Sequence, residues 1–184
     1  MLSRKDFMAG CTAAVCGSGL CAQAAASPDT AGCDPKALKS AVAHTESAQF
    51  RFAKLVEQLA RELPEEAADK ILRGLGRQCA ATYKTDLLDR FKGDIHGFLE
   101  EGRKNWMAQA DYDEASGLIR IVDRQTVCVC PAVRQGMTPQ AFCACTLGWQ
   151  EAAYSAILGK PVKAELEESI LRGGKRCVYR INVL

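Results

Sequence analysis

The sequence predicts an α+β fold, with N-terminal helices followed by a ββαββ antiparallel sheet that has a helix packed across it. Two observations support this order. Apolar residues recur at helical spacing in three segments between about residues 35 and 104. In residues 106–184, alternating segments surround two glycine turns and flank one further helical segment. We therefore expect a single domain, residues 27–184, with a helical half and a cysteine-rich half.

Residues 1–26 have the layout of a cleaved export signal. Arg4 and Lys5 precede a mostly apolar run of small residues, and alanines near its end supply a cleavage site. This run is too short and too rich in glycine to serve as a membrane anchor. Residues 3–8 resemble the twin-arginine export signal with lysine as the second basic residue, so that route and the ordinary secretory route both remain open. We expect an exported protein, periplasmic or extracellular, without a stable membrane anchor after cleavage.

The charge balance of the chain argues against polyanionic partners. The 184 residues include 24 basic and 22 acidic side chains, and removing Arg4, Lys5 and Asp6 leaves 22 and 21. A near-neutral chain without a basic run offers no positively charged surface for nucleic acid or an anionic membrane. With only two histidines, His44 and His96, a multi-histidine zinc hydrolase is not expected. A small-molecule ligand is the expected partner, and a homodimer is possible.

Three helices are expected in the first half. Asp34 and Pro35 form a start signal for a helix over about 35–62. Pro64 begins a second helix, which we expect to end where glycines stand at 74 and 76. The third covers about 84–104. Apolar residues at helical spacing define the inward face of each helix.

The second half begins with a hairpin that turns at Ser116-Gly117. Its second strand is expected to run on into Cys128-Val129-Cys130, which would place both sulfurs on one face, and to end at Pro131. A helix over 147–158 follows. Strands over 162–170 and 176–183 then form a second hairpin around a two-residue Gly-Gly turn.

That turn sets a definite register for the second hairpin. It pairs Ile170 with Cys177, Glu168 with Tyr179 and Leu166 with Ile181, which places Glu168 on an apolar face. A carboxylate there is costly unless it is paired, protonated or open to a cavity. Two interpretations stay open: Glu168 borders a cavity, or it lies in solvent at the edge of the sheet.

The C-terminal 80 residues or so carry a pattern of cysteine, glycine, glutamate and aromatic positions: Cys143, Cys145, Gly148, Glu165, Gly173, Gly174, Cys177 and Tyr179. This pattern resembles the 4-vinyl-reductase-like group of small-molecule-binding domains. It is also similar to the L-2-amino-thiazoline-4-carboxylate hydrolase-like family. The resemblance implies a compact α+β domain with a buried ligand pocket beside the cysteines, in either an enzyme or a sensor.

The cysteines allow three interpretations. In the first, Cys128, Cys130, Cys143 and Cys145 bind one metal, zinc or an iron–sulfur centre, with sulfurs within roughly 4 Å of one another and Glu168 beside them. In the second, the two Cys-x-Cys segments pair as disulfides. In the third, Cys143 or Cys145 is a nucleophile near a helix start, with Glu168 or Asp123 as base. The first residue of the helix near 147 decides whether Cys143 and Cys145 can bind one metal ion. If both lie on the helix, their side chains point roughly 200° apart and cannot face the same ion.

Aromatic residues near these cysteines are candidates for the lining of a pocket for a planar ligand, although such residues are also ordinary core: Phe142, Trp149, Tyr154 and Tyr179. The first expectation is an exported small-molecule-binding domain with a metallated cysteine cluster. An alternative is a thiol- or metal-dependent hydrolase that opens a small cyclic substrate of the 2-amino-thiazoline-carboxylate type. The second alternative is a disulfide-stapled structural or binding domain without catalysis.

Overall fold

The computed structural model describes residues 34–83 and 85–184. The expected export signal lies outside these residues. The chain divides into two units, the first ending at Gln49 and the second beginning at Phe50. The described part of the first unit is one helical segment with exposed side chains, and the second unit contains the sheet and the candidate site. None of the helices in the described part is long and apolar enough to cross a membrane.

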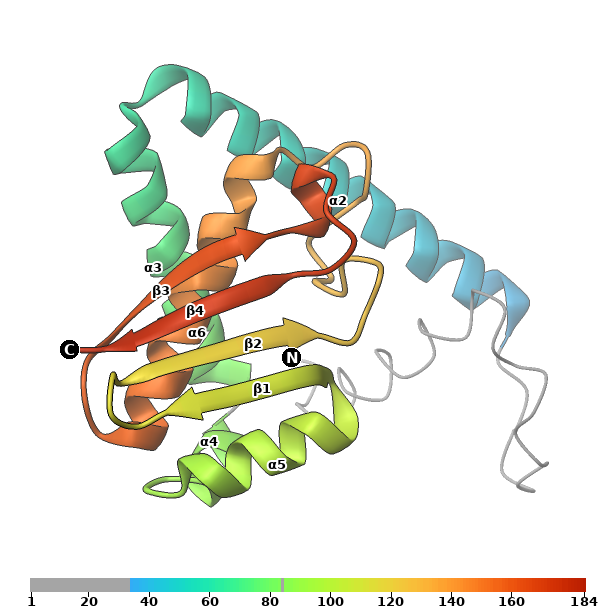
Figure 1. Ribbon diagram of the computed structural model, residues 1–184. Helices are drawn as coiled ribbons and strands as arrows, with labels where there is room; N and C mark the ends of the chain where they lie inside the picture. Colours follow the sequence, from blue (N-terminus) through green and yellow to red (C-terminus); the bar gives the residue numbers. More distant parts are fainter. Residues whose placement is uncertain (1–33, 84) are drawn as a thin grey trace. The chain divides into compact units, whose positions relative to one another are not determined.

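The expected α+β class is confirmed (Figure 1). The helices are α2 (Pro35–Glu62), α3 (Glu65–Tyr83), α4 (Thr85–Arg90), α5 (Ile95–Asn105) and α6 (Cys143–Leu158). The strands are β1 (Met107–Asp113), β2 (Leu118–Asp123), β3 (Val162–Glu168) and β4 (Val178–Val183). Two short 3₁₀ segments, η2 (Gln140–Phe142) and η3 (Ile170–Arg172), precede α6 and follow β3.

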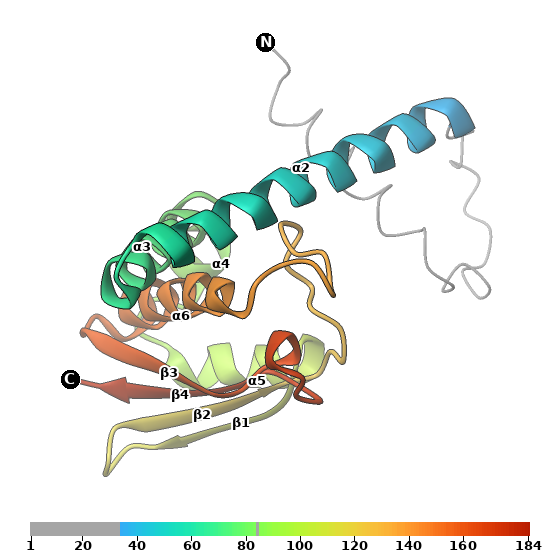
Figure 2. The ribbon, with the colours of Figure 1, turned by 90° about the horizontal axis from the view of Figure 1, so that it is seen from above.

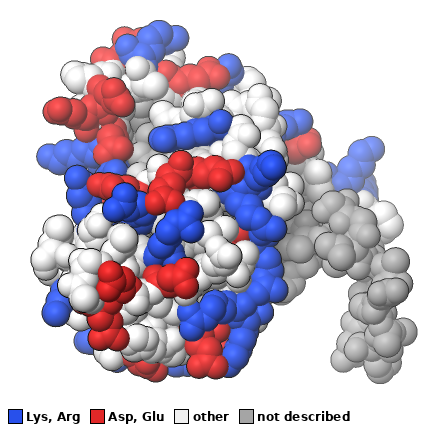
Figure 3. All heavy atoms as spheres, viewed as in Figure 1, with Lys and Arg blue, Asp and Glu red and all other residues white. Residues whose placement is uncertain are grey.

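The four strands form an antiparallel sheet in the order β1-β2-β4-β3. Alternation buries Ile121 and Ile181 on one face, while Arg120 and Arg180 project from the other. Both of these arginines pair with Glu167, at 2.9 and 3.7 Å. Figure 3 shows this open face with basic and acidic side chains interspersed. The sheet therefore has one core face and one solvated face.

Helix α6 lies on the core face of the sheet, and α3 packs on the other side of α6 (Figure 2). Two glycines make the crossing of α3 and α6 close. A Cβ atom at Gly76 would overlap the carbonyl group of Cys145, and one at Gly148 would overlap the backbone of Arg73. The expectation that the second helix ends near Gly76 is therefore wrong, because this glycine is a packing contact inside a helix that continues to Tyr83.

The single helix expected over 84–104 is two helices. Gly93 has φ +81°, a left-handed conformation that glycine adopts without strain, and it separates α4 from α5. Asp94 then caps α5, since its carboxylate accepts a hydrogen bond from the backbone nitrogen of Gly97 at 2.8 Å. A helical apolar pattern does not reveal such an interruption.

The second hairpin forms, but its expected register is wrong by two residues. Leu166 pairs with Tyr179 and Ala164 with Ile181, because η3 makes the connection longer than two residues. A shift by two residues keeps each side chain on its expected face. A bulge between Leu166 and Glu168 then breaks the alternation.

The strand expected to carry Cys128 and Cys130 ends earlier. β2 stops at Asp123, and the chain from 124 to 139 has no regular strand or helix. The guanidinium of Arg176 holds the start of this segment by donating to the carbonyl oxygens of Asp123 and Arg124, at 3.1 and 2.6 Å. The cysteines at 128 and 130 therefore lie on an irregular loop.

Candidate ligand cavity

A cavity of about 400 Å³ lies within the second unit, between the core face of the sheet, α3, α6 and the 124–139 loop. Every strand contributes a side chain to its wall: Met107 from β1, Ile121 from β2, Leu166 from β3 and Tyr179 from β4. Alternation along the strands aims these side chains inward, where α6 does not fill the whole space. This volume falls in the range of small-molecule sites.

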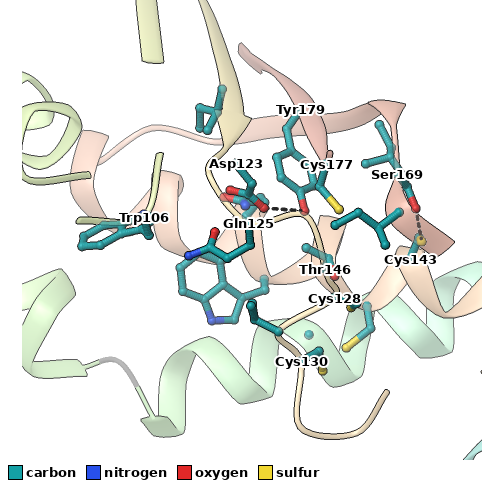
Figure 4. A pocket seen from close by; sticks show the side chains of 18 of the residues that line it. Trp106, Asp123, Gln125, Cys128, Cys130, Cys143, Thr146, Ser169, Cys177 and Tyr179 are labelled. Atoms are coloured by element: carbon teal, nitrogen blue, oxygen red, sulfur yellow. Dashed lines mark hydrogen bonds between the residues drawn. The ribbon is translucent and has the colours of Figure 1, made fainter. Parts of the chain in front are cut away.

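All six cysteines in the described part of the chain line this cavity as free thiols: Cys79, Cys128, Cys130, Cys143, Cys145 and Cys177. Figure 4 shows several of them on one side of the space. Burial raises the pKa of Cys145 to about 12 and raises the pKa values of Cys128, Cys130 and Cys143 as well. A thiol with a raised pKa is protonated at neutral pH and is a poor nucleophile. The disulfide pairs of the second alternative are not formed.

The predicted four-thiolate group is not formed either. Helix α6 begins at Cys143 rather than at 147, so Cys143 and Cys145 both lie on its first turn and point in different directions. Cys143 contacts Ser169, with 3.1 Å between sulfur and oxygen, whereas Cys145 is close to Cys79 and Cys130. Within residues 34–83 and 85–184, no group of three or more His, Cys, Asp and Glu side chains is placed to hold a metal ion. A zinc or iron–sulfur cofactor stays a prediction from the sequence.

Glu168, the expected base or cavity neighbour, does not line the cavity. Its carboxylate accepts hydrogen bonds from the backbone nitrogens of Lys175 and Arg176, at 2.5 and 3.3 Å, and so closes the turn before β4. The bulge after Leu166 is the physical reason, because it removes Glu168 from the inward row. The structure therefore brings neither Cys143 nor Cys145 together with Glu168 as a nucleophile and base.

The polar end of the cavity is built around Asp123. Its carboxylate accepts a hydrogen bond from the Tyr179 hydroxyl at 3.4 Å, and Gln125 and Trp106 lie nearby (Figure 4). Burial raises the pKa of Asp123 to about 6, more than the hydrogen bond from Tyr179 lowers it. Tyr154, on α6, also lines the cavity, and its hydroxyl is fully buried without a hydrogen-bond partner among the described residues.

The aromatic residues singled out from the sequence all line the cavity: Phe142, Trp149, Tyr154 and Tyr179. The sequence pattern indicates Asp123 only as an alternative to Glu168 in the role of a base. One signal was present: Ile119, Ile121 and Asp123 alternate along one strand, so an inward carboxylate follows two buried isoleucines. No signal in the sequence brings Trp106 or Gln125 to the same place.

Comparison with protein-family models gives no match, and comparison with curated proteins gives none either. Two solved structures share the fold. A trafficking protein particle complex subunit 3 from Naegleria fowleri, solved covalently bound to palmitic acid, is 13% identical, with a TM-score of 0.50 over 78% of this chain and 96% of that one. The phenol-responsive sensory domain of the transcription activator PoxR, solved with phenol, is 15% identical, with a TM-score of 0.50 over 73% of this chain and 74% of that one. At these identities the likeness concerns the fold alone.

Proposed function

We propose that this protein is a small-molecule-binding domain whose ligand occupies the cavity beside α6. The observation that carries the proposal is the cavity itself, a space of about 400 Å³ with an apolar, aromatic wall and a few convergent polar groups. Sites for small organic ligands have this composition and size. All the residues that line the cavity belong to the second unit.

The comparisons support this proposal without naming the ligand. One protein of the same fold is described as phenol-responsive and was solved with phenol, and another was solved covalently bound to palmitic acid. Both molecules place an apolar body beside a single polar group, which suits a wall of this kind. The resemblance of the C-terminal pattern to the 4-vinyl-reductase-like group points in the same direction. The hydrolase alternative gains no support, because the thiols are protonated and Glu168 lies elsewhere.

Export is part of the proposed function, and it rests on the sequence of residues 1–26. A fusion of this segment to a reporter distinguishes the two routes. Arg4→Lys keeps the charge, so the secretory route tolerates it, whereas a twin-arginine signal fails. Export of the unchanged fusion supports the proposal, and retention of the unchanged fusion inside the cell contradicts it.

Ligand binding can be tested by filling the cavity. Thr146 lines the cavity on α6, so Thr146→Phe would occupy part of its volume. Thr82, an exposed residue of α3 outside the wall, provides the matched control Thr82→Phe. Phenol and toluene are titrated by calorimetry. We expect binding to the unchanged protein and to Thr82→Phe, and binding weaker by about fivefold or more to Thr146→Phe. Equal binding by all three proteins, or binding by none, would contradict the proposal.

A further inference from the structure

We propose that the ligand carries a protonated amine on an apolar, ring-sized body, and that this ammonium group pairs with Asp123 inside the cavity. This inference rests on the proposed function, because it concerns the same cavity. It specifies the chemical class of the ligand through the groups that stand at the polar end of the wall.

The first observation is a half-buried carboxylate without a cation. In the described part of the chain, the side chain of Asp123 has one hydrogen bond, from Tyr179 at 3.4 Å, and no salt bridge. Such a distance is long for a bond between a hydroxyl and a carboxylate, so the bond is weak. A carboxylate removed from water is costly unless a cation or strong donors face it. A ligand ammonium would supply that partner.

The neighbouring arginines do not fill this role. Arg176 donates to the backbone carbonyl oxygens of Asp123 and Arg124, at 3.1 and 2.6 Å. Arg124 donates to the carbonyl oxygen of Met107 at 3.1 Å and also to that of Arg103. Arg176 therefore holds backbone at the end of β2, and Arg124 holds backbone where α5 meets β1. Neither guanidinium group pairs with the carboxylate of Asp123, which lines the cavity.

The second observation is an independent one, the hydroxyl of Tyr154. It is fully buried on α6, lines the same cavity and has no hydrogen-bond partner among the described residues. A buried hydroxyl without a partner is uncommon, and a bound ligand is one explanation for it. An ammonium group has three donors. The carboxylate of Asp123 and the oxygen of Tyr154 are acceptors that match them.

The rest of the wall suits the body of such a ligand. Phe98, Trp106 and Trp149 line the cavity, and aromatic faces attract cations as well as apolar groups. The same geometry disfavours carboxylates, since a second anion would meet Asp123 in a space of low dielectric. The proposed class therefore excludes a substrate of the 2-amino-thiazoline-carboxylate type from binding with its carboxylate at this end.

A definite pH dependence follows. The titratable groups that face Asp123 are Tyr179 from β4 and Tyr154 from α6, and burial raises the pKa of each, so both stay neutral below pH 8. Asp123 is the group among the three that titrates near pH 6. Protonation of Asp123 would remove the attraction for an ammonium group and leave the attraction for a neutral ligand largely unchanged. The preference for amines should therefore be large at pH 8 and small at pH 5.

The test compares phenylmethylamine, phenylmethanol and toluene, three probes of similar size, by calorimetry on the full chain at pH 8 and pH 5. We expect phenylmethylamine to bind at least about tenfold more tightly than phenylmethanol at pH 8. Asp123→Asn should reduce this ratio to about twofold or less while phenylmethanol binding persists. Tyr154→Phe should weaken amine binding about three- to tenfold and change toluene binding by less than about twofold, since only the hydroxyl group is removed.

Each remaining outcome counts against a specific claim. If toluene and phenylmethanol bind but phenylmethylamine binds no better, the amine inference is overturned and the cavity remains a small-molecule site. A tenfold preference that persists in Asp123→Asn also overturns it, because the preference would then come from another group. If none of the three probes binds to the unchanged protein, the proposed function fails and the inference fails with it.

Discussion

The hydroxyl of Tyr179 on β4 donates a hydrogen bond to the carboxylate of Asp123 at the end of β2, with 3.4 Å between the two oxygens. This bond lowers the pKa of Asp123, but burial raises it more, to about 6. A carboxyl group whose pKa is raised by folding opposes the folded state whenever it is ionised. Ionised Asp123 therefore lowers the stability of the folded state, and carboxyl groups with raised pKa values are common at functional sites.

The first prediction concerns stability as a function of pH. The unfolded chain releases the Asp123 proton near pH 4 and the folded chain near pH 6, so between these values the folded state binds more protons and stability falls as pH rises. Two pKa units correspond to about 3 kcal/mol. The amide that replaces the carboxyl group has no proton to release, so Asp123→Asn should escape this loss. We therefore expect the free energy of unfolding of Asp123→Asn, minus that of the unchanged protein, to increase by about 2–3 kcal/mol between pH 4 and pH 8. Urea unfolding at both pH values measures this difference, and a difference independent of pH would show that Asp123 has an ordinary pKa.

The second prediction concerns the close crossing of α3 and α6. Gly76→Ala would drive a methyl group into the carbonyl of Cys145, and we expect a loss of about 3 kcal/mol or more in the free energy of unfolding. Gly74→Ala is the matched control two residues earlier in the same helix, where a Cβ atom meets nothing within 4 Å. It should stabilise the protein by about 0.5–1 kcal/mol, through helix propensity alone. Equal effects of the two changes would mean that the helices do not approach closely at Gly76.

Gly76 also marks the limit of what the sequence could predict. Local patterns located most elements, because the helical period over 35–62 and the alternation in the two hairpins are properties of neighbouring residues. The sequence does not distinguish a glycine that ends a helix from a glycine that lets a second helix pack closely against the first. The distinction depends on Cys145 and Trp149, which lie about 70 residues further along the chain and reach Gly76 only after folding.

The candidate site was predictable in location but not in chemistry. The cysteines and aromatic residues named from the sequence do line one cavity. Their chemistry depended on where α6 begins, and a start at Cys143 separates the directions of Cys143 and Cys145. The bulge after Leu166 had a similar effect on Glu168. The start of α6 directly follows η2 and the bulge precedes η3, and no local period in the sequence reveals either short segment.

The third prediction concerns thiol reactivity. Burial raises the pKa of Cys145 to about 12, and the pKa values of Cys128, Cys130 and Cys143 are raised for the same reason. At pH 8 these thiols should react with iodoacetamide about tenfold or more slowly than glutathione, and rapidly once urea unfolds the chain. Mass spectrometry of the alkylated peptides gives the rate at each site. Thiols that stay unreactive after unfolding, until a reductant is added, would instead show disulfides.

The fourth prediction concerns the ion pairs that tie α3 to α6. Arg73 pairs with Glu151 at 2.6 Å and with Asp69 at 2.7 Å, and its side chain is 20% exposed. Arg73→Met should lower the free energy of unfolding by about 2 kcal/mol, since it leaves Glu151 partly buried with only Arg77 beside it. The control Arg61→Met removes an exposed pair with Glu62 and should change stability by less than about 0.5 kcal/mol. Similar losses in the two variants would contradict a structural role for the Arg73 pair.

The central claim, that a small molecule occupies the cavity beside α6, is tested most directly by methyl NMR during titration with phenylmethylamine and toluene. Ile121 and Ile170 line the cavity, while Ile157 and Ile181 are also buried but lie outside its wall. We predict saturable shifts in the methyl signals of Ile121 and Ile170, with those of Ile157 and Ile181 nearly unchanged. Unchanged signals from Ile121 and Ile170 at saturating concentrations of both probes would contradict the claim.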